Sequence, residues 1–218
     1  MKSSAILFIN GEIDIAFCER YIKSHFDNYP VFCADGAYNS VRLSCHLYQK
    51  LVSVIGDGDS IDVIKTSNHI DYILAEDQEY TDFEKSLLHL LQMGIKRLVI
   101  FGFGGKEMDH YLGNVSTALA FKDEIDFMFI DQHGQSVFLS PEFRLENVKN
   151  KMVSVLPLPV LKGISYHGLK YPLDKATLTL GRRVGTRNQA TSDVIEIHYD
   201  SGDGLVFISH ENYRGKNE

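Results

Sequence analysis

The segment Val54–Lys85 reads VIGDGDSIDVIKTSNHIDYILAEDQEYTDFEK, and the rest of the chain is organised around it. It contains two short apolar runs of the kind that form buried strands, followed by a pattern of helical spacing that begins at TDFEK. Acidic residues stand where these elements end or begin, namely Asp57, Asp59, Asp77 and Asp82. Carboxylates at such positions can converge on a metal ion, so this segment is the first candidate for a functional site.

Strands and helices alternate on both sides of this segment, from Ser4 to about Asp131. This alternation implies a mostly parallel sheet with helices on both faces, a Rossmann-like three-layer α/β domain. In such sheets the ligand crevice lies outside the carboxyl ends of the strands. The predicted strands are residues 5–10, 30–36, 51–59, 71–77, 97–105 and 126–131, and the predicted helices are residues 13–26, 41–51, 81–93 and 109–122.

The pattern changes after about Gln135, where short β-like runs are separated by turn residues and no amphipathic helix follows. Examples are VFLS, FRLE, MVSVLPLP, GISYHGLKY and DVIEIHY. We therefore predict two domains, residues 1–135 and 136–218, with a small antiparallel β-sandwich or barrel in the second.

Composition narrows the class of function. The chain has 218 residues, of which 44% are hydrophobic and 23% charged, which is ordinary for a folded globular protein. A formal net charge of -7 argues against binding nucleic acid or an anionic membrane, so small molecules are the expected partners. Three cysteines without a CxxC pair favour a reducing cytoplasm, and no apolar run is long enough to span a membrane.

The acidic turn Asp57-Gly58-Asp59-Ser60 follows an apolar strand. Residues two apart in an extended segment face the same way, so both carboxylates can reach one hard cation, and Gly58 leaves room for a phosphate. A plain Gly-Asp turn is the alternative, and such turns are common.

The segment Thr81-Asp82-Phe83-Glu84 fits a capping box with Thr81 as the N-cap. Asp82 and Lys85 are three apart, so both lie on the face opposite the apolar stripe. A helix N-terminus favours anions, and a lysine one turn inside it can hold a phosphate. The alternative is a structural cap beside a solvated ion pair.

A glycine-rich segment, Gly102-Phe103-Gly104-Gly105-Lys106, joins a strand to a helix. Its backbone N–H groups could hold phosphates, although it matches neither a Walker A sequence nor GxGxxG. Asp109 follows as a site residue or as the cap of the next helix. Carboxylates, a lysine and glycines at neighbouring strand ends together suit a magnesium-nucleotide site.

Five motifs in order resemble the thiamine pyrophosphokinase family, and the resemblance extends over most of the chain. They are Asp35-Gly36-Ala37-Tyr38-Asn39 (family ADGGAN), Gly56–Ser60 (GDxDS), Asp77-Gln78 with Thr81–Lys85 (DQxxTDFEK), Gly102–Asn114 (a glycine turn ending in DHxxxN) and Gly168–Leu173 (GLKYPL). The sequence departs from the family at Lys106 and Glu107, which stand where the family has glycine and arginine, and at Arg187, which precedes Asn188 where the family has serine.

The resemblance implies a transfer of the pyrophosphoryl group of ATP to the hydroxyl of thiamine, giving thiamine diphosphate and AMP. It implies that residues 1–135 form the catalytic ATP- and Mg2+-binding domain. Residues 136–218 would form a β-sandwich that binds thiamine and dimerises, with the active sites of the homodimer between subunits.

The resemblance also assigns site residues. It places Mg2+ on Asp57, Asp59 and Asp82, and adds Asp109 and Lys85 to the catalytic set. The expected cofactor-binding residues are Asp35, Gly36, Gln78, Thr81, Gly104, Gly105, Lys106, Asn114 and Asn188. Two alternatives remain: a Mg2+-dependent kinase or phosphohydrolase acting on another small alcohol or nucleotide, and a nucleotide-binding protein without catalysis.

Overall fold

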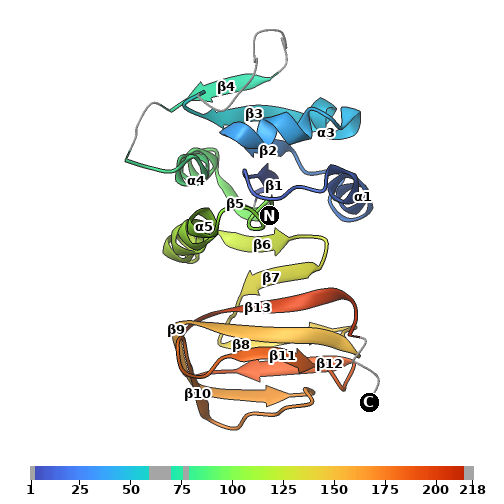
Figure 1. The fold of residues 1–218 in the computed structure, drawn as a ribbon, viewed down its shortest axis with the longest axis vertical. Coiled ribbons are helices and arrows are strands. Elements are labelled where there is room, and N and C mark those ends of the chain that lie inside the picture. Colours follow the sequence, from blue (N-terminus) through green and yellow to red (C-terminus); the bar gives the residue numbers. More distant parts are fainter. Residues whose placement is uncertain (1–2, 59–69, 76–78, 214–218) are drawn as a thin grey trace. The chain divides into compact units, whose positions relative to one another are not determined.

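The computed structural model describes residues 3–58, 70–75 and 79–213 and divides the chain into two compact units, residues 1–132 and 133–218 (Figure 1). Each unit has its own hydrophobic core, and the acidic segment belongs to the first. None of the helices in these described ranges is long and apolar enough to cross a bilayer.

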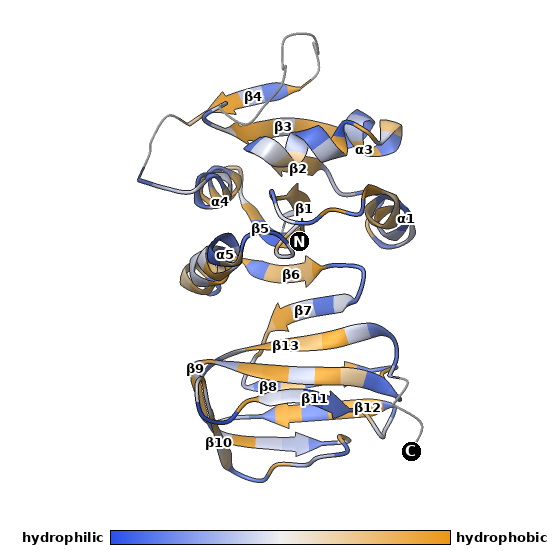
Figure 2. Ribbon diagram, in the orientation of Figure 1, coloured by the Kyte–Doolittle hydropathy of each residue, from blue (hydrophilic) through white to orange (hydrophobic). Residues whose placement is uncertain are grey.

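The first unit contains a sheet whose described strands are all parallel, in the order β4-β3-β2-β1-β5-β6. Its strands are β1 (Ser3–Phe8), β2 (Val31–Ala34), β3 (Leu51–Gly56), β4 (Asp71–Leu74), β5 (Ile95–Phe101) and β6 (Asp126–Ile130). All six were predicted. The inner strands are buried on both faces and are nearly continuous apolar runs (Figure 2), whereas β4, at the end of the strand order, is only partly buried.

Helices flank the sheet on both sides, with α1 on one side and α4 and α5 together on the other (Figure 1). They are α1 (Ile15–His25), η1 (Asp35–Ala37, a 3-10 helix), α2 (Tyr38–Val41), α3 (Cys45–Lys50), α4 (Asp82–Gln92) and α5 (Met108–Phe121). The single helix predicted over residues 41–51 is wrong. The Ser44 side chain accepts a hydrogen bond from Leu47 N and starts α3 anew, so that the helix is broken after α2.

The strand order sets the position of the crevice. The chain passes from β1 outward through β2, β3 and β4, and then returns to the other side of β1 to form β5. The switch in direction therefore lies between β1 and β5, and a ligand crevice is expected outside their carboxyl ends.

The second unit is antiparallel, and the long strand β9 pairs with β10, β11, β12 and β13. Its strands are β7 (Gly134–Phe138), β8 (Glu142–Glu146), β9 (Lys151–His167), β10 (Ala176–Thr179), β11 (Gly185–Gln189), β12 (Val194–His198) and β13 (Ser201–Asn212). Parallel strands first and antiparallel strands afterwards agree with the predicted mixed fold class. MVSVLPLP and GISYH, which looked like separate runs, form the one strand β9.

Candidate active site

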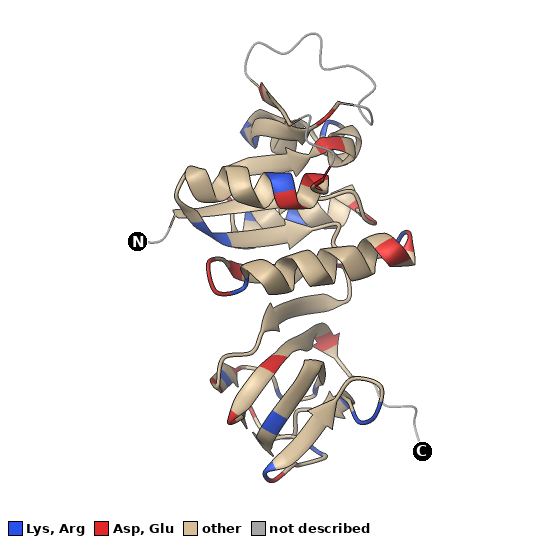
Figure 3. Cartoon of the chain, turned by 90° about the vertical axis from the view of Figure 1, so that its left-hand side faces the viewer, with Lys and Arg blue, Asp and Glu red and all other residues tan. Residues whose placement is uncertain are grey.

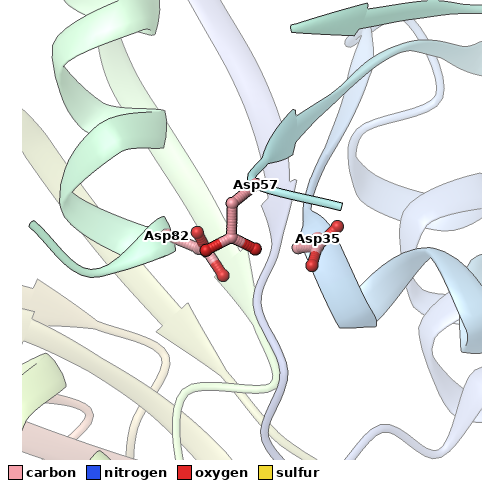
Figure 4. A group of neighbouring side chains, drawn as sticks. All are labelled: Asp35, Asp57 and Asp82. Atoms are coloured by element: carbon pink, nitrogen blue, oxygen red, sulfur yellow. The ribbon is translucent and has the colours of Figure 1, made fainter. Parts of the chain in front are cut away.

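Three carboxylates from three different elements converge at the carboxyl edge of the parallel sheet. Asp35 begins η1 directly after β2, Asp57 follows β3, and Asp82 is the first residue of α4. One carboxylate oxygen of each lies within 4.8 Å of the others, with Asp57 between Asp35 and Asp82 (Figure 4). Asp57 and Asp82 meet as expected, and the structure adds Asp35 as the third carboxylate.

Asp35 is packed tightly into this edge and is only 1% exposed. Its side chain lies against Gly56, where an added Cβ would stand 2.5 Å from the Cβ and 2.8 Å from the Cγ of Asp35. Since real Cβ atoms do not approach so closely, a glycine at the end of β3 is what admits Asp35.

Lys85 lies beside the acidic cluster and is almost completely buried. Its Nζ is 3.3 Å from Asp82 Oδ1 and 3.8 Å from Asp57 Oδ2, and its side chain is 6% exposed. The Asp57 and Asp82 side chains are 18% and 33% exposed, so solvent reaches these carboxylates. The solvated ion pair considered from the sequence is therefore not what forms, because Lys85 is enclosed.

The start of α4 is fixed by the predicted cap. Thr81 Oγ1 accepts a hydrogen bond from Glu84 N at 3.2 Å, which confirms Thr81 as the N-cap and sets the orientation of the first helical turn. The apolar side chains Phe83, Leu87 and Leu90 are buried beneath the helix. Capping and burial together hold Asp82 and Lys85 at the end of α4 that lies next to the strand ends.

The donor set suits a hard divalent cation. All three ligand groups are carboxylates, and oxygen is the donor that Mg2+, Mn2+ and Ca2+ prefer. Carboxylate oxygens within 4.8 Å of one another are close enough to be shared by one cation. Ionised carboxylates this close together repel one another, and a bound cation would offset that repulsion.

A glycine turn lies at the carboxyl end of β5, between β5 and α5, and β1 separates β5 from β2 in the sheet. Gly102 and Gly105 have φ angles of 75° and 91°, which are conformations that favour glycine. Asn114 Nδ2 donates a hydrogen bond of 3.0 Å to the carbonyl oxygen of Phe103, so Asn114 anchors the glycine turn from the second turn of α5.

One further site residue predicted from the sequence, Asp109, lies at the start of α5. The N-cap is Glu107, and Asp109 lies exposed in the first turn, so the alternative of Asp109 as the cap is wrong. Acidic residues mark the N-terminal ends of both α4 and α5, which point in the same direction (Figure 3). Among the described residues, the close cluster contains Asp35, Asp57 and Asp82 but not Asp109.

Comparison with known proteins agrees with this geometry. Residues 24–129 match the family model described as "Thiamin pyrophosphokinase, catalytic domain", and residues 142–202 match "Thiamin pyrophosphokinase, vitamin B1 binding domain". Together these matches cover well over half of the chain. The chain belongs to the thiamin pyrophosphokinase family.

Individual relatives are distant in sequence and close in fold. Thiamin pyrophosphokinase 1 of Caenorhabditis elegans is 25% identical over 193 residues, which cover 82% of this chain and 78% of the relative. The Bacillus subtilis thiamine pyrophosphokinase is 27% identical over 147 residues, 63% of this chain and 69% of the relative. The crystal structure of the B. subtilis thiamine pyrophosphokinase superposes with a TM-score of 0.77 at 19% sequence identity and covers 94% of this chain and 98% of that chain. The crystal structure of the yeast thiamin pyrophosphokinase superposes with a TM-score of 0.76 at 17% sequence identity and covers 95% of this chain and 86% of that chain.

The structure describes only some of the other residues that the family resemblance assigned to the site. Asp59, Asp77 and Gln78 lie outside the described residues. Asn188 is buried in β11, and its amide binds backbone groups: Oδ1 accepts from Tyr171 N (3.0 Å) and Gln189 N (2.9 Å), and Nδ2 donates to Tyr171 O (2.8 Å). Asn188 therefore fixes the GLKYPL segment of the second unit.

Sequence reasoning missed the residues that follow β1. Glu12 N donates to Gly104 O at 2.7 Å, and the Asn10 side chain accepts a hydrogen bond from Lys106 Nζ at 3.0 Å. The available signal was an Asn-Gly pair at the carboxyl end of a predicted strand, the same position that singled out Asp35 and Asp57.

Proposed function

We propose that this protein is a thiamine pyrophosphokinase that transfers the pyrophosphoryl group of ATP to the hydroxyl of thiamine. The observation that carries the proposal is the convergence of Asp35, Asp57 and Asp82, within the segment that matches the family's catalytic domain. Such a site needs both a cation that offsets triphosphate charge and backbone N–H groups that donate hydrogen bonds to phosphate oxygens.

The acidic half of the site would hold Mg2+. Asp57 and Asp82 are the proposed ligands with Asp59, and the buried Asp35 is placed to complete the set. A bound Mg2+ neutralises phosphate charge and aligns the triphosphate. Lys85 lies against the same carboxylates, so its ammonium group can contact both the acids and an incoming phosphate.

The phosphate half is the glycine turn. Gly104, Gly105 and Lys106 are the proposed triphosphate contacts, and Asn114 supports them by holding the carbonyl of Phe103. Asp109 shapes the approach from the first turn of α5, where its exposed carboxylate is available to ligand or metal. The proposed ATP contacts near the acids are Gly36, Thr81 and Gln78.

The thiamine half of the proposal rests on the second domain, residues 136–218. We assign it a β-sandwich architecture, supported by a core cluster that draws on β9, β10, β12 and β13. Asn188 contributes by fixing Tyr171 for the thiamine site. The protein would act in the cytoplasm as a homodimer with active sites between subunits. A monomer in light scattering that is fully active would contradict the shared active sites.

The reaction forms one bond and breaks one. The oxygen of the thiamine hydroxyl attacks the β-phosphorus and loses its proton, while the bond from the β-phosphorus to the oxygen on the α-phosphorus breaks. AMP leaves with that oxygen and its electron pair, and thiamine keeps the β and γ phosphates. Because little covalent chemistry falls to the protein, its residues act by positioning and by offsetting charge.

Incubating the full-length protein with ATP, MgCl2 and thiamine tests the assignment. The expected products are AMP and thiamine diphosphate in equal amounts, separated by chromatography. ADP or inorganic phosphate would instead indicate a kinase or phosphohydrolase acting on another group. Unchanged ATP, with nucleotide binding retained, would indicate a binding protein.

The metal assignment gives a first prediction about a single residue. Asp57→Asn should lower kcat by roughly a hundredfold or more, because it removes a charge that would hold the cation aligning the phosphates. The fold should remain intact, since the substitution relieves repulsion among three carboxylates. Steady-state AMP formation and thermal unfolding with and without MgCl2 measure the two effects.

Asp123→Asn is the matched control, because Asp123 is 87% exposed at the amino edge of the sheet, between α5 and β6. Its activity and its Mg2+ response should equal those of the unsubstituted protein. If Asp57→Asn kept normal turnover, Asp57 would not be a metal ligand.

A further inference from the structure

We propose that Asn10 is a positioning residue that holds Lys106 at the triphosphate site and joins the glycine turn to the acidic half of the site. The inference rests on the proposed function, in which Lys106 contacts ATP. It concerns a residue that lies outside the five family motifs and is distant in the chain from both halves.

The position of Asn10 follows from the strand order. Asn10 comes directly after β1, and β1 lies between β2, which carries Asp35 at its end, and β5, which carries the glycine turn. Asn10 therefore stands at the switch point of the sheet, where the strand end on one side supplies a carboxylate and the strand end on the other supplies backbone amides.

The Asn10 amide contacts both neighbours. On one side it lies over Gly36, where an added Cβ would stand 2.7 Å from Asn10 Nδ2 and 3.0 Å from Cγ. On the other side Asn10 Oδ1 accepts a hydrogen bond of 3.0 Å from Lys106 Nζ. One side chain thus links the residue next to Asp35 with a lysine that is 96 positions away.

The backbone around Asn10 is fitted closely to the glycine turn. A Cβ added to Gly11 would stand 2.1 Å from Gly102 O, and a Cβ added to Gly102 would stand 2.1 Å from Ile9 O. Glu12 N also donates to Gly104 O at 2.7 Å. These backbone contacts fix the turn itself, so the long and exposed Lys106 side chain is the part that Asn10 must orient.

This arrangement gives Lys106 a defined location before ATP arrives. A lysine side chain has many rotamers, and restricting them in advance lowers the entropy lost when its ammonium group binds a phosphate. The contact also fits the departure from the family pattern, because Lys106 stands where the family has glycine and Glu107 stands where it has the positively charged arginine.

The experiment is a double-mutant cycle on the full-length protein, read by calorimetric binding of MgATP. Lys106→Ala should weaken binding, and both Asn10→Ala and Asn10→Leu should raise the Kd about fivefold, as expected for one lost hydrogen bond. In the Lys106→Ala background, Asn10→Ala should have no further effect, because Asn10 acts through Lys106. Turnover should show the same rise in KM for ATP with kcat changed less than about twofold.

The controls separate positioning from folding. Asn10→Leu retains volume over Gly36 but removes the acceptor, so a normal Kd in this variant would overturn the proposal. The proposal would also be overturned if the rises in Kd caused by Asn10→Ala and by Lys106→Ala multiplied in the double variant. A normal Kd in Lys106→Ala would overturn it as well. Asn28→Ala, an exposed asparagine before β2 at the opposite edge of the sheet, should bind MgATP normally. Since binding needs no turnover, failure to form thiamine diphosphate would count against the proposed function alone.

Discussion

At the scale of single residues, burial separates the site from an ordinary charged surface. Lys85 looks from the sequence like half of a solvated i,i+3 pair, yet its side chain is enclosed and contacts two carboxylates. Its ammonium group offsets part of the repulsion among the converging acids before any cation binds. Lys85 therefore supports the cluster in addition to its proposed contact with phosphate.

Lys85→Met should reveal this supporting role. Removing the ammonium group takes away a positive charge that contacts both Asp57 and Asp82, and because both carboxylates are partly exposed we expect a loss of about 2 kcal/mol in the free energy of unfolding in EDTA. MgCl2 should restore part of that loss. Urea unfolding with and without Mg2+ measures both quantities.

Lys96→Met is the control for Lys85→Met, since Lys96 is an exposed residue near the amino end of β5. It should change stability little in either condition. Equal stability of Lys85→Met and the unsubstituted protein in EDTA would show that the buried ammonium group does not offset the acids.

The three cysteines should differ sharply in reactivity. Burial raises the pKa of the Cys18 thiol to about 12 and that of the fully buried Cys33 thiol further, whereas Cys45 is exposed. A raised pKa means that the thiol stays protonated at pH 8, and the thiolate is the reactive form. An aromatic disulfide reagent should therefore label one thiol rapidly in the native protein and three after denaturation. Rapid labelling that persists in Cys45→Ser would contradict this.

Among the helices and strands, sequence patterns predicted correctly those features that depend on residues close together in the chain. The N-cap at Thr81 and the buried stripe of α4 depend on residues three or four apart, so the sequence predicted both. The continuous helix over residues 41–51 failed because Ser44 caps a new helix, and two predicted runs merged because β9 continues through Pro157 and Pro159. In both cases apolar periodicity did not mark the boundary.

Gly56→Ala tests how closely β3 is fitted to η1. The added Cβ would meet the Cβ of Asp35, an atom next to the backbone that cannot swing aside. We expect a loss of about 1–3 kcal/mol in the free energy of unfolding, as for overpacking in a core, together with reduced activity because Asp35 is displaced. Urea unfolding and AMP formation give the two measurements.

Gly113→Ala is the matched control, because a Cβ at this helical position in α5 meets nothing within 4 Å. It should be neutral or stabilising by up to about 1 kcal/mol, since alanine favours helices over glycine. If the two variants were equally stable, the close contact between Gly56 and Asp35 would not constrain the site.

At the scale of the whole molecule, the chain contains two separate cores. One is centred on β1, β2, β3 and β5, and the other on β9, β12 and β13. Every residue of the first cluster precedes Gln132, and every residue of the second follows His133. A boundary near residue 135 was predicted from the change in pattern.

Because the second unit has its own hydrophobic core, we expect it to fold in isolation. The isolated segment 133–218 should give a β-type far-UV spectrum and a cooperative urea transition, because its apolar cluster is built from its own strands. Circular dichroism and urea titration of that segment measure this, with the full chain as the reference. A segment that unfolds without a transition would show that its core depends on residues 1–132.

The amino-acid sequence was enough to predict the alternation of strands and helices, the change to short β-like runs after residue 135, and the acids and glycines at the strand ends. These are local properties, set by side-chain periodicity and by the conformations that glycine allows. The order of the strands in the sheet, with β1 between β2 and β5, could be seen only in the folded structure. The pairing of β2 with β3 brings Asp35 to Asp57, and the packing of α4 adds Asp82 and encloses Lys85. The place of β1 beside β5 sets Asn10 against Lys106. The reason is physical: strand neighbours and side-chain burial depend on packing between distant segments, which local pattern does not encode.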